Sequence, residues 1–169
     1  EALIMRNNIN KSGKIFFHRM SDEKGASVVE FSLLAPLFIF FIFAVIQMGA
    51  VLTIDNALEA SIREGARYGI TAQGGSSRDS QIRNVIQTIA KNYSGGLINP
   101  SNLIITINSY PTFQALDANT SASNGAGTGN QAVKYQVQYT WDTIFPIFGS
   151  SNLIVLKAQT PVMNEGFEN

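Results

Sequence analysis

The side chains that most often carry out catalysis are scarce in this sequence. The chain has a single histidine, His18, and no cysteine. A nucleophile needs a base beside it, and a thiolate or thiolate-bound metal needs cysteine. The acidic residues after the apolar run near the N-terminus are scattered over predicted helices, loops and the tail: Asp55, Glu59, Glu64, Asp79, Asp117, Asp142, Glu165 and Glu168. We therefore expect this protein not to be an enzyme.

Two segments resemble cofactor sites but lack residues that those sites require. Residues 125–129 read Gly-Ala-Gly-Thr-Gly, but a phosphate loop joins a strand to a helix, and a strand is predicted to follow here. Residues 117–121 alternate oxygen side chains as a calcium loop does, but Ala122 replaces its glycine and Thr128 its bidentate glutamate. We expect no cofactor and no bound metal. Residues 117–130 have almost no apolar side chains to bury, which predicts a mobile surface loop.

Glu30 is the most unusual single residue, because it is an acid within an apolar run. Residues 28–48 read VVEFSLLAPLFIFFIFAVIQM, and Glu30 is their only charge. A carboxylate within a bilayer is costly, so such residues usually serve a function. The alternative is a carboxylate near a helix N-terminus and the interface, where the helix dipole stabilises it. The residues alone leave both interpretations open.

The run around Glu30 predicts a membrane-spanning helix. About 20 residues of helix cover about 30 Å, the thickness of a bilayer core. The run is apolar on every side, and a chain of 169 residues has no core large enough to surround it. A secretory signal peptide is the competing interpretation, but its apolar segment is usually shorter and ends at a small-residue cleavage site, which Gly49-Ala50 fits poorly.

Charges before this run predict its orientation. Residues 1–25 carry more basic than acidic side chains, although the whole chain has zero formal charge: Arg6, Lys11, Lys14, Arg19 and Lys24 against Glu1, Asp22 and Glu23. Basic residues before a membrane helix hold that end in the cytoplasm. We expect a single-pass protein of the inner (cytoplasmic) membrane with its C-terminal domain in the periplasm or outside the cell. The bias is too small for nucleic-acid binding.

Helical periodicity continues beyond the membrane run. Apolar residues at every fourth position predict that the first helix extends to about Tyr68: Ile54, Leu58, Ile62, Ala66 and Ile70. Residues 74–77, Gly-Gly-Ser-Ser, break the pattern. Spacings of three and four then predict a second amphipathic helix over residues 79–93, which ends before Gly95-Gly96.

A stripe of small residues runs along the first helix. Its members are four positions apart: Gly49, Thr53, Ala57, Ser61, Gly65 and Gly69. Small side chains let another backbone approach closely. The stripe can seat the protein's own sheet or second helix, or it can be a packing face for a neighbouring subunit, and both uses can share it.

After Pro100 the apolar period changes from about 3.6 to 2, which indicates strands. Strands are predicted from about Leu103 to Asn108, from Val133 to Trp141, and from Leu153 to about Val162. We therefore predict an α+β fold in which two helices cover a small three-stranded antiparallel sheet. The expected organisation is a basic leader over 1–25, a transmembrane helix extended into an exported amphipathic helix over 26–72, and a small exported domain over 73–169.

The residues around Glu30 resemble the processing site of type IV prepilins. The segment reads Lys24-Gly25-Ala26-Ser27-Val28-Val29-Glu30-Phe31. The glycine precedes the apolar helix, and the glutamate is the fifth residue after the glycine. Together with Asn56-Ala57-Leu58-Glu59 and Arg63-Glu64-Gly65-Ala66-Arg67-Tyr68-Gly69, residues 22–70 are similar to TadE-like pseudopilins of tight-adherence (Flp-type) pilus systems. After Ala72 the sequence has no motif that selects among TadE-, TadF- and TadG-like members.

This resemblance implies a minor pilin-like subunit that a prepilin peptidase cleaves between Gly25 and Ala26. It also implies assembly roles for Glu30 and Phe31, with other pilin or pseudopilin subunits, the pilus assembly machinery and membrane lipid as partners. Whether the subunit enters the fibre stays open. The alternative function is a signal-anchored exported binding domain that is never cleaved at Gly25 and is unrelated to a pilus.

Overall fold

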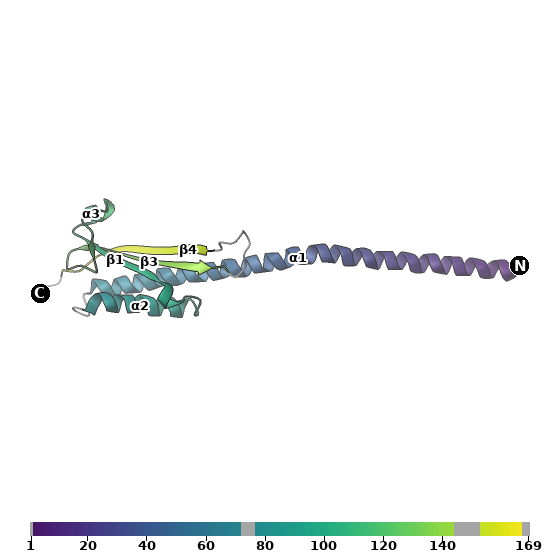
Figure 1. The fold of residues 1–169 in the computed structure, drawn as a ribbon, viewed down its shortest axis with the longest axis horizontal. Helices are drawn as coiled ribbons and strands as arrows, with labels where there is room; N and C mark the ends of the chain where they lie inside the picture. Colours follow the sequence, from purple (N-terminus) through teal and green to yellow (C-terminus); the bar gives the residue numbers. More distant parts are fainter. Residues whose placement is uncertain (1, 72–76, 144–152, 167–169) are drawn as a thin grey trace. The chain divides into compact units, whose positions relative to one another are not determined.

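One helix dominates the N-terminal part of the chain, and an α+β unit follows it. The computed structural model describes residues 2–71, 77–143 and 153–166, with side chains from Gly25 onward. The chain forms two compact units, Glu1–Val45 and Ile46–Asn169. The elements, in chain order (Figure 1), are α1 (Ala2–Ile70), α2 (Arg78–Tyr93), the short 3-10 helix η2 (Pro100–Asn102), β1 (Ile104–Tyr110), α3 (Phe113–Asp117), β2 (Ser123–Asn124), β3 (Ala132–Asp142) and β4 (Leu153–Met163).

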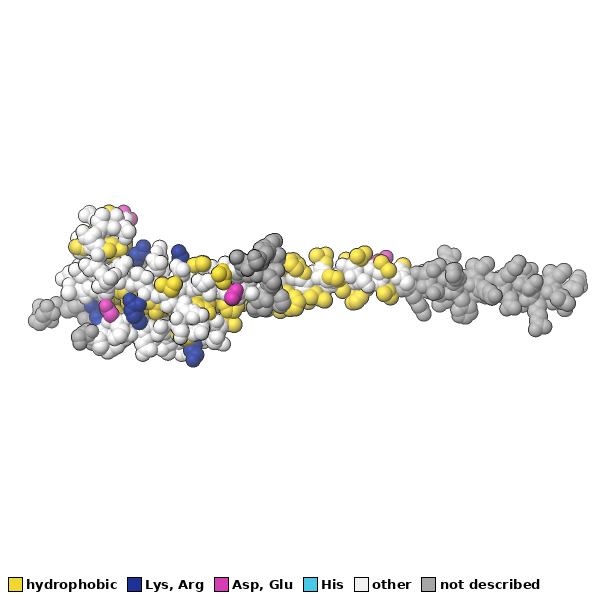
Figure 2. Space-filling model, viewed as in Figure 1, with side chains coloured by type: hydrophobic (Ala, Val, Ile, Leu, Met, Phe, Trp, Pro, Cys, Tyr) yellow, Lys and Arg dark blue, Asp and Glu magenta, His cyan; other side chains and the backbone are white. Residues whose placement is uncertain are grey.

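The first unit consists of α1 up to Val45, and most of its described side chains are apolar and exposed (Figure 2). Phe31 and Leu33 are each more than 70% exposed, at 72% and 73%. Within the described residues, one helix is long and apolar enough to cross a membrane, over Gly25–Ile70. This suggests a single-pass membrane anchor. The charged side chains of the predicted leader lie outside the described side chains.

The second unit has two layers, a helical layer and an antiparallel sheet. The sheet order is β2-β1-β3-β4, and its register pairs Ile107 with Tyr135 and Val137 with Ala158. Alternation along β3 turns one set of side chains into the core: Val133, Tyr135, Val137 and Tyr139. The α+β class is confirmed. The predicted count of three strands is wrong, because β2 adds a fourth that consists of two polar residues and therefore has no apolar period.

The helical layer is formed by the second half of α1 and by α2. Their apolar stripes meet the inner face of the sheet, and their buried residues are Ile54, Leu58, Ile62 and Ala66 from α1 and Ile82, Ile86 and Ala90 from α2. The end of α2 agrees with the predicted one, because Gly95 and Gly96 have φ values of +62° and +88° and the amide of Gly96 donates to the carbonyl of Lys91 at 3.1 Å. The predicted break at residues 74–77 lies mostly outside the described residues.

The segment predicted as a loop over 117–130 contains β2 and is anchored beyond it. The Ala126 amide donates to Asp79 Oδ1 at 2.9 Å, and Asn164 Nδ2 donates to the carbonyls of Ala126 and Thr128 at 2.7 and 2.9 Å. These bonds tie the second half of the segment to α2 and to the residues after β4. The mobility of residues 117–130 stays a prediction.

Candidate functional site

The predicted processing site lies within α1 and is open to solvent. Gly25 and Ala26 are both exposed. A β-carbon added at Gly25 would meet nothing within 4 Å, and its φ is not positive. The described structure therefore gives no packing or conformational reason for glycine at position 25. A requirement for glycine there would have to come from another molecule that binds this segment.

Glu30 is exposed and lies in the interior of α1. Among the residues with described side chains, no hydrogen bond or ion pair involves its carboxylate. The helix begins at Ala2, and the dipole of a helix acts mainly within its first turn. Stabilisation of Glu30 by the helix dipole thus requires a new helix N-terminus close to it. Cleavage before Ala26 would create one.

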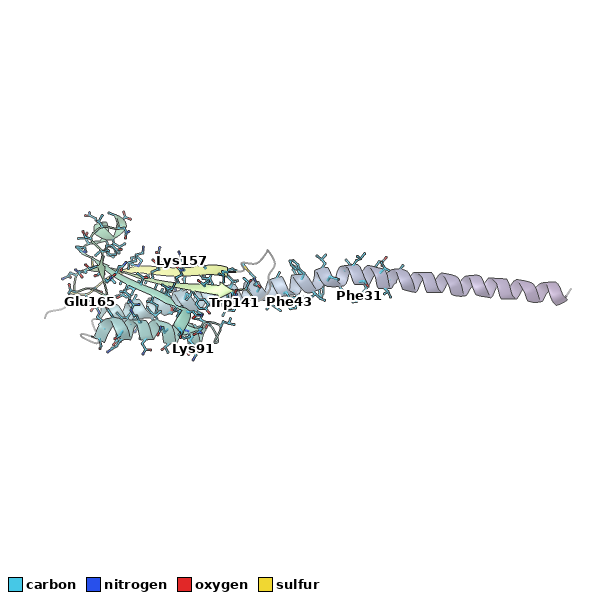
Figure 3. All side chains as sticks on the ribbon, viewed as in Figure 1. Phe31, Phe43, Lys91, Trp141, Lys157 and Glu165 are labelled. Carbon is cyan, nitrogen blue, oxygen red and sulfur yellow. The ribbon has the colours of Figure 1, made fainter. Side chains whose placement is uncertain are left out.

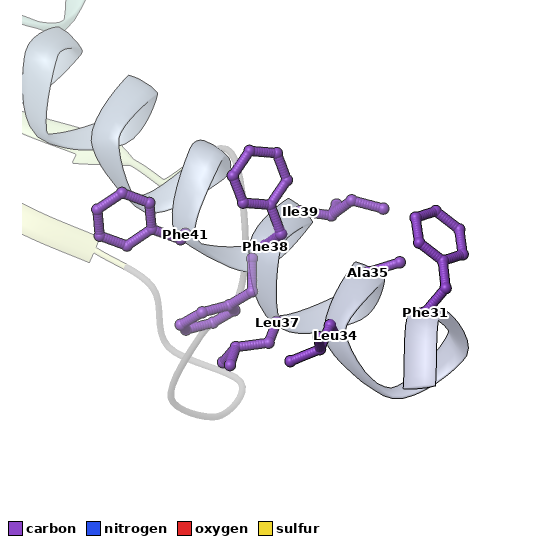
Figure 4. A pocket seen from close by; sticks show the side chains of 8 residues that line it. Phe31, Leu34, Ala35, Leu37, Phe38, Ile39 and Phe41 are labelled. Atoms are coloured by element: carbon purple, nitrogen blue, oxygen red, sulfur yellow. The ribbon is translucent and has the colours of Figure 1, made fainter. Parts of the chain in front are cut away.

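Phe31 belongs to an apolar group around Glu30. Figure 4 shows a hollow along this part of α1 that is lined only by apolar side chains: Phe31, Leu34, Ala35, Leu37, Phe38, Ile39, Phe40 and Phe41. Pro36 lies among them, and its ring nitrogen cannot donate the usual helical hydrogen bond. Lipid chains or another apolar helix could fill this surface. Contact of these side chains with water is unfavourable, because moving each methylene group out of water stabilises the protein by about 0.8 kcal/mol.

The small-residue stripe divides into two parts. Ala57, Ser61, Gly65 and Gly69 are buried within the second unit. A β-carbon at Gly65 would overlap the side chain of Ile86, and one at Gly69 would overlap the phenol of Tyr135. At Gly49, by contrast, a β-carbon would meet nothing within 4 Å, and Thr53 is exposed with its hydroxyl bonded to the Gly49 carbonyl at 2.8 Å. The unit's own packing thus occupies the stripe from Ala57 onward, and Gly49 and Thr53 are left open.

A buried arginine joins four segments that are distant in sequence, and sequence reasoning did not identify it. Arg78 is 8% exposed. Its guanidinium donates to the carbonyls of Gly69 and Gly127, the latter at 2.8 Å, and to Asn164 Oδ1 at 3.2 Å. The arrangement connects the end of α1, the start of α2, the loop before β3 and the residues after β4. The role of Arg78 in the described structure is to hold these segments together.

The phenol of Tyr135 is a second buried polar group in the same region. Its hydroxyl makes no hydrogen bond to any described residue. Burial raises the pKa of Tyr135 to about 12, the nearby Arg78 charge lowers it, and Asp79 raises it. The phenol is therefore neutral at physiological pH and cannot act as a nucleophile there. Among the described residues, no group of three or more His, Cys, Asp or Glu side chains could hold a metal ion.

Comparison with known proteins gives one match. The family model described as TadE-like protein matches residues 25–67, a stretch that begins at Gly25 and lies within α1. No curated protein and no solved structure matches the chain. The match covers the predicted processing site, Glu30, the apolar surface and most of the small-residue stripe. Residues 25–67 of this chain are thus similar to TadE-like proteins.

Proposed function

We propose that this protein is a minor pilin-like subunit that helps to assemble a tight-adherence (Flp-type) pilus after a prepilin peptidase removes residues 1–25. The observation that carries the proposal is the TadE-like match, which starts at Gly25 and continues along the apolar helix. TadE-like proteins are associated with tight-adherence pilus systems. Further support comes from Gly25, whose identity has no explanation within the chain's own packing.

Cleavage would give Glu30 a partner that it lacks among the residues with described side chains. It would leave an α-ammonium group on Ala26, four residues before Glu30 and about one helical turn away. An unpaired charge in an apolar environment is costly, whereas a paired ammonium and carboxylate attract strongly. The pair can form within one helix or between the helices of neighbouring subunits. Pairing between neighbours would favour assembly, and Phe31 would add apolar contact beside it.

The experiment compares Glu30→Gln and Glu30→Ala with the wild type in the native host. Membrane insertion should be retained, because loss of a charge makes the run more apolar. Cleavage should also be retained, because Gly25 and Ala26 are unchanged. Crosslinking to pilin partners should fall in both variants. Leu33→Ala is the matched control, because Leu33 is apolar and 73% exposed, and its substitution leaves the charge pair in place.

Two results would argue against this role. Normal crosslinking of both Glu30 variants would show that the carboxylate does not act in assembly. A wild-type chain that contacts no pilus component would favour the alternative, a signal-anchored exported binding domain.

A further inference from the structure

The exposed apolar side chains of the second unit are concentrated at one end, which we call the proximal rim. The rim consists of five residues that are between 38% and 66% exposed: Leu52, Tyr93, Leu97, Leu153 and Val155. At the opposite end, the large apolar side chains that are exposed among the described residues are Phe113 and Met163, each at 44%. Ile104 lies on the sheet between the two ends.

Packing within the unit explains why the rim residues share one end. Gly69, near the end of α1, lies against Ile82 near the start of α2, so the two helices run in opposite directions. From Ile82 to Tyr93, α2 advances about 16 Å at about 1.5 Å per residue, which returns it toward the beginning of the unit. At the same end β3 finishes and β4 starts, because Leu153 pairs with Asp142 (Figure 1). Figure 3 labels Lys91 and Trp141 near this end and Glu165 at the other.

One rim residue, Leu52, lies on α1 shortly after the predicted membrane segment. The apolar run ends at Met48, and Leu52 lies about 6 Å further along the same helix. Ile46 and Met48 are 51% and 59% exposed within the second unit. Leu52 thus lies about one helical turn beyond the apolar run, at the depth where headgroups would meet a helix that crosses a bilayer. Tyrosine and lysine are the residues that favour this region, and the rim has Tyr93 with Lys91 beside it.

The rim residues lie on opposite layers of the unit. Tyr93 and Leu97 belong to the helical layer, whereas Leu153 and Val155 point away from it on the outer face of β4. A protein bound to one face would cover one of these sets and leave the other in water. A lipid surface that α1 crosses would reach both.

The charges near the rim are mixed. Lys91 and Lys157 are exposed basic residues, and Asp55 and Asp142 are acidic. The rim therefore has no basic excess that would require anionic lipid. The sequence that follows Thr143 begins Ile-Phe-Pro-Ile-Phe, and it lies outside the described residues. A surface of this composition suits neutral headgroups, with apolar burial as the main attraction.

We propose that the proximal rim rests in the lipid headgroup region and holds the second unit against the membrane. The contact depends on the membrane anchor, and it does not depend on the pilus role. It restricts how the unit can tilt about α1 before any partner binds. Neutral phosphatidylcholine should be sufficient for it, and added salt should not release it.

The test uses nitroxide labels on single cysteines, because the natural chain has no cysteine. The full chain is reconstituted at one copy per phosphatidylcholine nanodisc, with the label at Tyr93, Leu153, Met163 or Phe38. All four side chains are exposed, so labelling should not disturb the core. The measured quantity is how often each label collides with a paramagnetic reagent. Frequent collision with dissolved oxygen indicates a lipid environment, and frequent collision with a water-soluble nickel complex indicates an aqueous one.

The labels at Tyr93 and Leu153 should favour oxygen, while the label at Met163 should favour nickel. Val155→Glu, introduced into the Leu153→Cys chain, should shift that label toward nickel, because a carboxylate resists transfer to the interface.

Aqueous signals at Tyr93 and Leu153 with a lipid signal at Phe38 would overturn the docking proposal and leave the anchor intact. An aqueous signal at Phe38 would overturn the anchor and the docking together. Protection at Tyr93 and Leu153 that appears only with several copies per nanodisc would assign the rim to contacts between copies and would also overturn the proposal. Loss of pilus assembly in the host, with these signals unchanged, would concern the proposed function alone.

Discussion

The backbone of Gly69 packs directly against the phenol of Tyr135, so that a β-carbon at position 69 would overlap the tyrosine ring and hydroxyl. This contact joins the end of α1 to the centre of the sheet. We expect Gly69→Ala to destabilise the second unit by about 1–3 kcal/mol, the usual cost of overpacking a core. Thermal unfolding of the full chain in detergent, followed by the fluorescence of its one tryptophan, Trp141, measures the change.

The matched control is Gly49→Ala, which is on the same helical stripe but meets nothing within 4 Å. Its unfolding midpoint should not fall. Tyr135→Phe in the Gly69→Ala background should recover part of the lost stability, because it removes the overlapping oxygen. Equal losses at Gly49 and Gly69 would show that the stripe is not divided as described.

The buried phenol also predicts an alkaline limit to stability. Burial raises the pKa of Tyr135 from 10.0 to about 12 in the folded chain. Below pH 10 the phenol is neutral in both states and the stability is complete. As the pH rises from 10 toward 12, the unfolded chain loses this proton before the folded chain does, so unfolding becomes more favourable by an amount on the order of 2 kcal/mol.

Denaturant titrations between pH 9 and pH 12 test this limit. Tyr135→Phe should lose less stability than the wild type over that range. At pH 7 the variant should be as stable as the wild type or more so, because the hydroxyl has no hydrogen-bond partner among the described residues. Parallel curves for the two proteins would mean that Tyr135 does not cause the alkaline loss.

Removal of the buried Arg78 charge should lower the stability of the second unit. Arg78→Met deletes the donor to Gly69, Gly127 and Asn164, and unpaired buried acceptors are expensive, so we expect a loss of roughly 3 kcal/mol. Hydrogen exchange should increase at residues 125–131. Arg67→Met is the control, because its side chain is 80% exposed and its ion pair with Glu64 is 3.8 Å long. If the two variants are equally stable, Arg78 does not hold these segments together.

Periodicity predicted most of the fold. The spacing of apolar residues in α2 and their alternation in β3 indicate which faces pack into the core. The buried side chains in the structure follow these patterns closely. The two-residue strand β2 was missed because Ser123 and Asn124 have no apolar alternation, and five-residue α3 is too short to show a helical period. Their positions depend on contacts with β1, which local sequence does not encode.

The candidate site was predictable in part. Gly25 and Glu30 stand out locally, because a glycine precedes an apolar run and an acid lies within it. The stripe from Gly49 to Gly69 is also visible in the sequence. Only the folded chain shows that Ile86 and Tyr135 pack against some of its members. The Arg78 cluster was not predictable, since its partners come from segments up to 86 residues apart.

The mass of the mature N-terminus tests the central claim most directly. The chain is expressed in its native host with its prepilin peptidase, purified from the membrane and analysed by mass spectrometry. The wild type should begin at Ala26, and Gly25→Val should accumulate as uncut precursor, because a β-branched side chain would replace the glycine hydrogen at the proposed cleavage site. A wild-type chain that retains Gly25 and the residues before it, or a Gly25→Val chain cut at the same place, would contradict processing as a prepilin.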